Sequence, residues 1–445
     1  MNLVQYIPFY NRIIRLAIPV VLSQIGQVTV SLADNIMVGH AGTHELAASA
    51  FANNVFIIGM FFGMGITYGL TPLVGKAYGN SEPEKVVQWL KNGIFTHLIA
   101  ASGLTLVMLG IYFTLPFMGQ EPGLLQLAKP YYLLLCASYL PFMLFFSVKQ
   151  FFEGIGNTKL AMHITLTSNV INVVLNYLLI FGKFGFPEMG LLGAGIGTFI
   201  SRLAMPLMYM VFIFRMAKYR RIFINASAQP LSRKRIFSIL NIGLPIGFQI
   251  IVEVTTFSVG AVMMGWHGET PLAAHQVAIG LASFSYMISL GISQATTIRV
   301  SHQLGQYDYK SLRMAVFAST HLVLLFMSLM SLIFIIARDY LPLIFSTDQS
   351  VVAIASRLLM VAAVFQIFDG LQVVMLSALR GMADVKIPMV IAFAAYMLVG
   401  LPVSYVSSFL LNAGPVGIWF GYLAGLGLAG VLFYFRFRRN VIKKA

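Results

Sequence analysis

The sequence predicts an all-α integral membrane protein whose twelve transmembrane helices form two parallel-repeat six-helix bundles around a central cavity. Three observations support this prediction: the composition, a series of long apolar segments and an internal duplication. The 445 residues are 58% hydrophobic and only 10% charged, whereas soluble domains average roughly 25% charged residues. This composition excludes an ordinary soluble fold and also a disordered chain.

Twelve apolar segments recur along the chain, and each can supply a membrane span of about 20 residues. They lack the period-two alternation of barrel strands, so helices are expected. The first segment is longer than the apolar core of a signal peptide, and we interpret it as a retained helix. The segments cover residues 13–38, 46–75, 92–115, 130–150, 161–181, 191–214, 241–264, 272–298, 315–336, 351–378, 387–410 and 416–435.

The orientation follows from the distribution of Lys and Arg. If the N-terminus is cytoplasmic, 24 of the 29 basic residues fall in inner segments, and only Lys129, Lys183 and Arg338 fall in outer loops. Arg202 and Arg357 lie inside spans. Because basic residues concentrate in cytoplasmic loops, both termini are expected inside. The net charge of +15 is thereby explained without a nucleic-acid partner.

The chain contains a duplication. Residues 16–80 match residues 242–306 at a fixed offset of 226, and the match continues later at an offset of 227. Six spans separate the copies, so both enter the membrane in the same direction, as in transporters built from parallel repeats. We therefore predict an N-terminal bundle (1–214), a basic cytoplasmic linker (215–240) and a C-terminal bundle with a basic tail (241–445). The matching pairs include Pro19/Pro245, Gly39/Gly265, Gly42/Gly268, Gly65/Gly291, Thr71/Thr297, Val74/Val300 and Gly154/Gly381.

Three carboxylates lie well inside apolar segments: Asp34, Glu253 and Asp369. A charged group at mid-span costs about 2.5–3.5 kcal/mol on insertion scales, and such groups usually face a cavity or a partner. A buried carboxylate either holds a proton or stays charged beside a cation. We therefore expect these three acids to couple H⁺ or Na⁺ binding to helix movement. The alternative for each is a protonated acid in an interhelical hydrogen bond.

Glu253 and Asp369 are expected at similar depth, roughly 18 and 17 Å from the inner side at about 1.5 Å per residue. They are candidate Na⁺ ligands, because hard cations prefer oxygen, and nearby backbone carbonyls can complete the shell. No Arg or Lys partner is expected at that depth.

Polar residues in the first bundle are expected near Asp34. Asn172 and Asn176 are four residues apart and so share one helix face, and Thr198 begins the next span. Packing between helices is the alternative role for such residues.

Two glycine patterns have a simpler interpretation than ligand binding. The segment 193–197 (GAGIG) superficially resembles a dinucleotide loop, but no strand precedes it, so we interpret it as packing at a span start. Gly65 and Gly69 form a GxxxG pair, which is typical of close helix contacts.

Several short motifs together resemble the multidrug and toxic compound extrusion (MATE) family, in its NorM-like bacterial branch. The resemblance extends over essentially the whole chain, and only the combination of motifs is specific. The motifs are Ala17-Ile18-Pro19, Ala33-Asp34-Asn35-Ile36-Met37-Val38-Gly39, Thr71-Pro72-Leu73-Val74-Gly75, Glu153-Gly154, Gly182-Lys183-Phe184-Gly185, Ala273-Ala274-His275-Gln276-Val277 and Leu379-Arg380-Gly381.

This resemblance implies a drug exporter with two six-helix lobes that exchanges inward Na⁺ or H⁺ for outward cationic drugs. It implies a second-lobe cation site whose acidic ligands look like Glu253 and Asp369. The first-lobe acid looks like Asp34, and its companions look like Asn172, Asn176 and Thr198. One departure is Phe365, which offers no hydroxyl where some relatives have one near the span-10 acid.

We therefore expect a multi-pass antiporter of the bacterial inner membrane that exports lipophilic cationic drugs. We expect it to be a monomer surrounded by lipid, with no cofactor other than the coupling ion and no enzymatic activity. Asp34 and Gln276 are candidate substrate-binding residues.

Three other functions remain open at the level of sequence. A flippase of lipid-linked oligosaccharides would need a cavity lined with Arg and Lys for pyrophosphate, and only Arg202 and Arg357 lie within spans. A membrane enzyme would need an interfacial cluster of catalytic groups, which the sequence does not offer. A passive channel is the third alternative.

Overall fold

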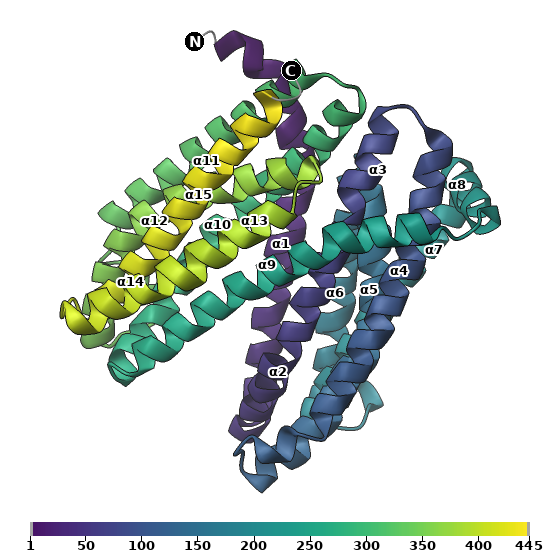
Figure 1. Cartoon of the computed structure of the whole chain (residues 1–445). Coiled ribbons are helices and arrows are strands. Elements are labelled where there is room, and N and C mark those ends of the chain that lie inside the picture. Colours follow the sequence, from purple (N-terminus) through teal and green to yellow (C-terminus); the bar gives the residue numbers. More distant parts are fainter. Residues whose placement is uncertain (1–2, 443–445) are drawn as a thin grey trace. The chain divides into compact units, whose positions relative to one another are not determined.

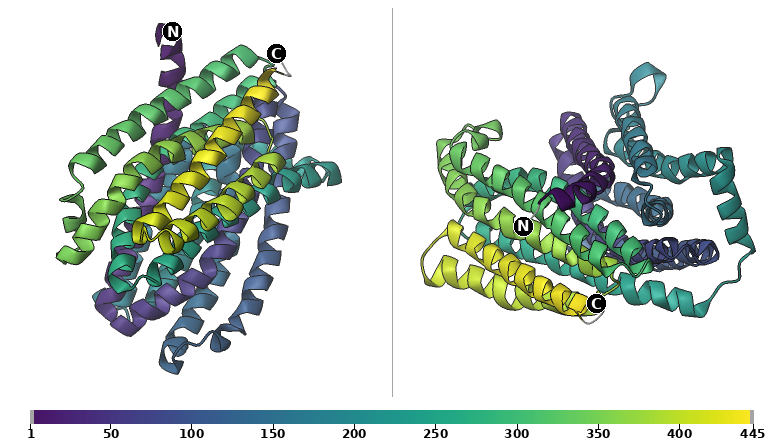
Figure 2. Two further views of the ribbon diagram at one scale, coloured as in Figure 1. Left: turned by 60° about the vertical axis from the view of Figure 1, so that its left-hand side comes forward. Right: turned by 90° about the horizontal axis from the view of Figure 1, so that it is seen from above.

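The structure is a computed structural model that describes residues 3–442. Within this range every regular element is helical, and twelve helices are long and apolar enough to cross a membrane. The predicted all-α fold with twelve spans is therefore confirmed. Figures 1 and 2 show the course of the helices along the chain.

The chain divides into two compact units. The N-terminal unit comprises residues 22–247, and the C-terminal unit comprises the residues up to Val21 together with those from Phe248 onward. These limits differ from the sequence-based boundaries at 214 and 241, because the first and seventh spans each run through the division as one continuous helix. Residues 217–228, inside the predicted linker, form a helix of their own.

The N-terminal unit holds the larger part of the first helix, seven complete helices and the start of the seventh span. Two short 3-10 turns, η2 (Leu115–Phe117) and η3 (Lys183–Gly185), lie in its loops. Its helices are α1 (Ile7–Ala41), α2 (Thr43–Tyr68), α3 (Leu70–Gly79), α4 (Pro83–Tyr112), α5 (Pro122–Gly154), α6 (Thr158–Ile180), α7 (Gly190–Arg215), α8 (Ala217–Ala228) and the beginning of α9 (Arg233–Gly265).

The C-terminal unit holds η1 (Leu3–Tyr6), the start of α1, the rest of α9 and the last five spans. The eleventh span is interrupted by two π-helical stretches, and η4 (Leu341–Ile344) is a 3-10 turn. The elements are α10 (Glu269–Gly305), α11 (Tyr309–Ile336), α12 (Gln349–Gly381), α13 (Lys386–Phe393), η5 (Ala394–Gly400), α14 (Leu401–Tyr405), η6 (Val406–Leu410) and α15 (Pro415–Ile442).

Local signals in the sequence begin several of these helices. The side chain of Asn157 accepts a hydrogen bond from the backbone of Leu160 at the start of α6, and Asp308 accepts one from Ser311 at the start of α11. Such caps satisfy amide groups that lack partners in the first turn. Pro122 begins α5, where its missing N–H costs nothing.

The duplication is visible in the packing of each unit. In the N-terminal unit, α5 packs against α2, α4 and α7; in the C-terminal unit, α12 packs against α10, α11 and α15. The two central helices, α5 and α12, have the same length of 33 residues and are related by the offset of 227. Each is therefore the central helix of one copy of the repeat.

Equivalent side chains make equivalent contacts in the two copies. A Cβ added to Gly154 would lie 2.8 Å from Cβ of Val74, and one added to Gly381 would lie 2.8 Å from Cβ of Val300. The hydroxyl of Thr71 donates to the backbone carbonyl of Gln150 at 3.2 Å, and that of Thr297 donates to the carbonyl of Ser377 at 3.0 Å. The matched glycines and threonines thus fix the same close helix crossing twice.

Each unit has its own hydrophobic core. One cluster of buried apolar side chains extends from Val38 to Ile239, and the other joins Tyr6, Ile13 and Ala17 to residues between 263 and 441. Large apolar side chains remain exposed along the spans, for example Leu106 (69%) and Leu325 (73%). In a membrane span such side chains face hydrocarbon at no cost.

Candidate functional site

The N-terminal unit places Asp34 beside the two asparagines that the sequence singled out. The amide of Asn176, on α6, donates a hydrogen bond of 2.7 Å to Oδ1 of Asp34, on α1. The same amide contacts Oδ1 of Asn172 at 3.4 Å. Asn176 is completely buried and Asn172 nearly so, while Asp34 is half-buried. The Asp34 carboxylate therefore has the Asn176 amide as a hydrogen-bond partner. Because Asp34 is only half-buried, a ligand can also reach the carboxylate.

Helix α7 packs against the two asparagines of this site. Gly197 lies so near that a Cβ at that position would be 2.1 Å from Oδ1 of Asn176. Asn172 donates to the hydroxyl of Ser201 at 3.3 Å. Thr198 is half-buried, and the contact it makes is through its backbone carbonyl, which accepts from Ser201 at 2.9 Å. A role for the Thr198 hydroxyl stays a prediction.

The same crossing confirms that the glycine segment at the start of α7 serves packing. Cβ atoms added to Gly193 and Gly195 would lie 2.7 Å from the backbone of Leu179 and from the side chain of Leu134.

Sequence reasoning missed Arg202 as a member of this site. Its guanidinium donates to the hydroxyl of Ser138 at 2.8 Å and lies over the rings of Phe142 (4.9 Å) and Phe56 (5.4 Å). The charges of Arg202 and Asp34 act on each other. The available signal was the spacing: Arg202 follows Thr198 by four residues and so shares its helix face.

The C-terminal unit brings Glu253 and Asp369 together. Glu253, on α9, is half-buried, and Asp369, on α12, is 6% exposed. The two carboxylates are close enough for their charges to act on each other. Two interacting acids in an apolar helix bundle repel each other unless a cation or a proton is present.

The expectation that no basic side chain reaches this depth is wrong. Arg380 lies at the end of α12, yet its charge acts on Glu253, and its guanidinium donates to Oε1 of Gln249 at 3.2 Å. Gln249 precedes Glu253 by one helical turn. The long side chain of Arg380 reaches Gln249 on the neighbouring helix. The depth expected from counting residues along α12 did not include the length of this side chain.

Tyr396 carries a hydroxyl within electrostatic reach of the two acids, whereas Phe365 has none. Phe365 is buried against aromatic rings, with the ring of Trp419 at 5.5 Å. Tyr396, on the π-helical stretch η5, is also buried, and the charges of Glu253 and Asp369 act on it. Because Tyr396 lies on a different span from either acid, sequence spacing gave no signal for it.

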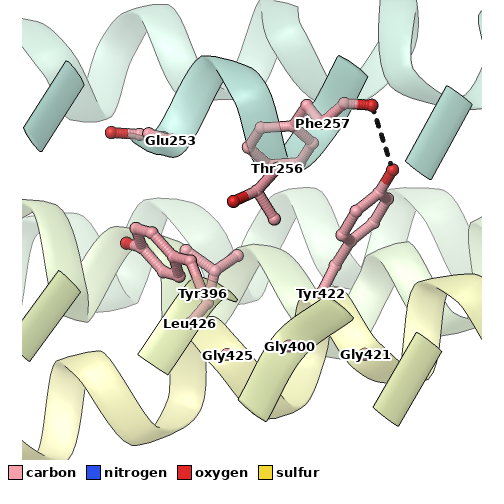
Figure 3. Close-up of a pocket in the computed structure, with 9 residues that line it drawn as sticks. All are labelled: Glu253, Thr256, Phe257, Tyr396, Gly400, Gly421, Tyr422, Gly425 and Leu426. Carbon is pink, nitrogen blue, oxygen red and sulfur yellow. Dashed lines mark hydrogen bonds between the residues drawn. The ribbon is translucent and has the colours of Figure 1, made fainter. Parts of the chain in front are cut away.

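A small cavity adjoins Glu253, and Figure 3 shows the residues around it. It contains about 240 Å³ of empty space, counting the part that opens to the surroundings. The hydroxyl of Tyr422 donates to the backbone carbonyl of Phe257 at 3.4 Å across one side. The lining comes from α9, η5 and α15: Glu253, Thr256, Phe257, Tyr396, Gly400, Gly421, Tyr422, Gly425 and Leu426.

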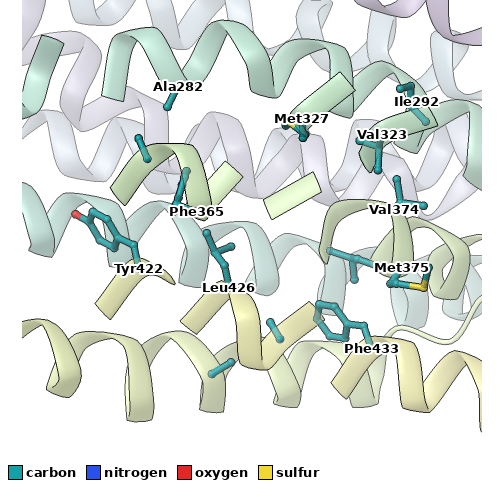
Figure 4. Close-up of a cluster of buried hydrophobic side chains, with 14 of the residues drawn as sticks. Ala282, Ile292, Val323, Met327, Phe365, Val374, Met375, Tyr422, Leu426 and Phe433 are labelled. Atoms are coloured by element: carbon teal, nitrogen blue, oxygen red, sulfur yellow. The ribbon is translucent and has the colours of Figure 1, made fainter. Parts of the chain in front are cut away.

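Glycines and the π-helix shape this cavity. A Cβ added to Gly421 would lie 2.3 Å from the carbonyl oxygen of Gly400, so α15 and η5 approach each other at backbone distance. π-Helical turns are uncommon and occur frequently at functional sites. Beyond the cavity, Tyr422 and Leu426 join the apolar core of the unit, which Figure 4 shows around Phe365 and Met327.

Two other expectations concern residues outside these sites. Gln276 is exposed near the start of α10, and its proposed contact with substrate stays a prediction. Within residues 3–442, no group of three or more His, Cys, Asp or Glu side chains gathers to hold a metal ion.

Comparisons with known proteins agree with this architecture. The family model MatE matches residues 19–178 and again residues 245–406, and the two matches begin 226 residues apart, which is the offset of the repeat. A probable multidrug resistance protein NorM of Rhodopseudomonas palustris is 35% identical over 95% of this chain and 90% of its own length. The multidrug resistance protein NorM of Aliivibrio fischeri is 31% identical over 95% of this chain and 92% of its own length.

A solved structure shows the same fold. The MATE transporter VcmN of Vibrio cholerae, in a bent form, has a TM-score of 0.87 over 99% of this chain and 98% of its own. At 17% identity this likeness concerns the fold alone. Together with the double family match and the relatives that span nearly its whole length, it shows that this chain is a multi-pass membrane transporter of the MATE family, in its NorM-like branch.

Proposed function

We propose that this protein is a cation-coupled antiporter that exports lipophilic cationic drugs from the bacterial cytoplasm, driven by inward Na⁺ or H⁺. The observation that carries the proposal is the placement of two acids in one apolar helix bundle: Asp369 is buried, and Glu253 lines a small cavity together with Tyr396. The relatives named as multidrug resistance proteins support drug export as the overall activity.

The coupling cation would bind in the C-terminal unit. A proton or Na⁺ between Glu253 and Asp369 removes their mutual repulsion, and a Na⁺ ion would find two carboxylates and the hydroxyl of Tyr396. Oxygen ligands of this kind suit a hard cation. Arg380 limits the negative charge of the pair, so binding of one monovalent cation leaves the site close to neutral.

The drug cation would bind in the N-terminal unit. Asp34 is half-buried and supplies the negative charge, while Asn176 holds the carboxylate in place. The aromatic rings of Phe56 and Phe142 lie against the guanidinium of Arg202, whose charge acts on Asp34. The charge of the Asp34 carboxylate in an apolar bundle attracts a lipophilic cation.

The proposal includes the inner membrane, with both termini cytoplasmic. The support is the excess of Lys and Arg in one set of loops. The start of α1 and the end of α15 also lie at the same end of the C-terminal unit in Figures 1 and 2, as an even number of spans requires.

The flippase alternative gains no support from the two arginines within spans. Arg202 is half-buried within electrostatic reach of Asp34, whereas Arg357 is exposed on α12. A pyrophosphate headgroup would need several cationic side chains that converge on one site.

The test is transport by purified protein in liposomes. Efflux of ethidium is measured under an imposed Na⁺ gradient and then under a pH gradient, for the wild type and for Glu253→Gln with Asp369→Asn. We expect the double variant to lose the gradient-driven part of efflux. Glu188→Gln, an acid in an exposed loop, is the matched control and should behave as the wild type. Gradient-driven efflux that survives the double substitution would refute the proposal.

A further inference from the structure

Arg299, near the end of α10, has no acidic partner among the described residues 3–442: none of the four salt bridges found there includes it. Its side chain is half-buried, and its terminal nitrogen Nη2 is buried without a hydrogen-bond partner. A guanidinium has five N–H donors and no acceptor, and a buried donor that is left unpaired is costly. The side chain of Arg299 therefore has an unused capacity to bind an anion.

Helix α1 brings a second arginine to the level of Arg299. A Cβ added to Gly291 would lie 2.3 Å from Cγ2 of Val21, so α1 and α10 are in close contact there. The two spans run in opposite directions, and nine residues back from Val21 or eight residues on from Gly291 cover a similar rise of about 12–14 Å. This register places Arg12 at the level of Arg299, and the charge of Arg12 acts on Arg299. Two like charges repel each other unless an anion lies between them.

The exposed face of α1 continues from this point into apolar side chains. Arg12 and Arg15 are both exposed, and so are Ile14 (40%) and Ile18 (52%). Arg15 and Ile18 are three residues apart and therefore neighbours on one helix face. Arginines followed by isoleucines further into the span match a phospholipid, which joins a charged headgroup to apolar chains.

The other copy of the repeat lacks the half-buried arginine. At the offset of 226, Arg299 corresponds to Leu73. The equivalent helix crossing is nevertheless present, because a Cβ added to Gly65 would lie 2.4 Å from Cα of Gly247. The crossing of the two helices therefore does not require an arginine, and the arginine is a feature of the C-terminal unit alone.

We propose that Arg12, Arg15 and Arg299 form a binding site for the phosphate group of an anionic phospholipid. Phosphate oxygens accept parallel hydrogen bonds from the planar guanidinium fork, and the acyl chains would lie along the exposed isoleucines of α1. With the orientation proposed above, the site faces the inner leaflet, where basic pockets between spans bind anionic headgroups.

The experiment measures lipid binding by the purified full-length protein in detergent micelles. Dioleoylphosphatidylglycerol is anionic, whereas dioleoylphosphatidylcholine has the same acyl chains and no net charge. Native mass spectrometry gives the occupancy of each lipid over a range of concentrations. We expect Arg12→Gln and Arg299→Gln each to weaken phosphatidylglycerol binding about tenfold, the usual effect of losing a hydrogen bond between charged groups, and to leave phosphatidylcholine binding unchanged. Arg299→Lys keeps the charge and should retain much of the preference.

Arg220→Gln is the matched control, because it removes an exposed arginine on α8 of the other unit; its affinity for phosphatidylglycerol should equal that of the wild type. Unchanged affinity in both glutamine variants overturns the inference. An equal loss in Arg220→Gln also overturns it, because binding then depends only on overall charge. If Arg299→Gln does not fold, as judged by thermal unfolding without lipid, the exposed Arg12 decides the test.

An excess of inorganic phosphate separates the two sources of the anion. Phosphatidylglycerol that stays bound in its presence supports a lipid site, because the acyl chains add to the affinity. Displacement of the lipid by phosphate would show a site for a free anion and would refute the lipid assignment.

Discussion

The substitution Gly197→Ala tests the geometry around Asp34 without changing any polar group. A Cβ at this position would lie 2.1 Å from Oδ1 of Asn176. A carbon–oxygen contact needs about 3.3 Å, so the Asn176 amide must move by about 1.2 Å. That displacement exceeds the tolerance of its 2.7 Å hydrogen bond to Asp34.

The expected effect follows from the strength of that bond. A hydrogen bond to a charged group contributes about 1.5–3 kcal/mol, and about 1.4 kcal/mol corresponds to a factor of ten in affinity. We therefore expect Gly197→Ala to raise the ethidium concentration for half-maximal export about tenfold to a hundredfold. Asn176→Ala should have a similar effect, and the two substitutions together should be no worse than either alone, because both remove one interaction.

The assay is the initial rate of ethidium efflux over a range of concentrations, with expression of each variant measured in the same membranes. Gly103→Ala on α4 is the matched control, because a Cβ there meets no other atom within 4 Å. Wild-type transport by Gly197→Ala, together with impaired transport by Asn176→Ala, would refute the placement of α7 against α6. Wild-type transport by both would show that the Asp34 site does not bind the drug.

Three further predictions concern stability and ion binding. Gly243→Ala should lower the stability of the N-terminal unit by about 1–3 kcal/mol, measured by thermal unfolding in detergent, because a Cβ there would lie 2.3 Å from the carbonyl oxygen of Ile66, an immobile backbone atom. Tyr396→Phe should raise the concentration of the coupling cation for half-maximal transport about fivefold, as expected for losing a hydrogen bond of about 1 kcal/mol; unchanged cation dependence would remove Tyr396 from the site. The hydrogen bonds from Ser311 hold the pKa of Asp308 below its usual range. The ionised Asp308 side chain therefore stabilises the fold above a pH of about 4. This stabilisation is lost as the pH falls further and the carboxylate becomes protonated. Asp308→Ala should therefore cost about 1 kcal/mol at neutral pH, and the difference from the wild type should shrink below pH 4; a difference that does not change with pH would contradict this reasoning.

The amino-acid sequence by itself determined the spans, the duplication and the pairing of Asn172 with Asn176. These features depend on composition and on spacing along one helix, and both are local properties of the chain. Of the glycines matched by offset, the structure places Gly154 and Gly381 at close helix crossings, where a side chain would collide with a neighbouring valine.

Only the tertiary structure decided which residues from different helices share a site. Arg202 and Asp34 are distant in sequence, and so are Tyr396 and Glu253, yet helix packing brings the members of each pair within electrostatic reach. The length of the Arg380 side chain and the π-helical turn that carries Tyr396 likewise have no periodic signal in the sequence. Helical periodicity shows which face of a helix a residue occupies, but the partner on the neighbouring helix depends on the crossing of the two helices, which is set by packing throughout the bundle.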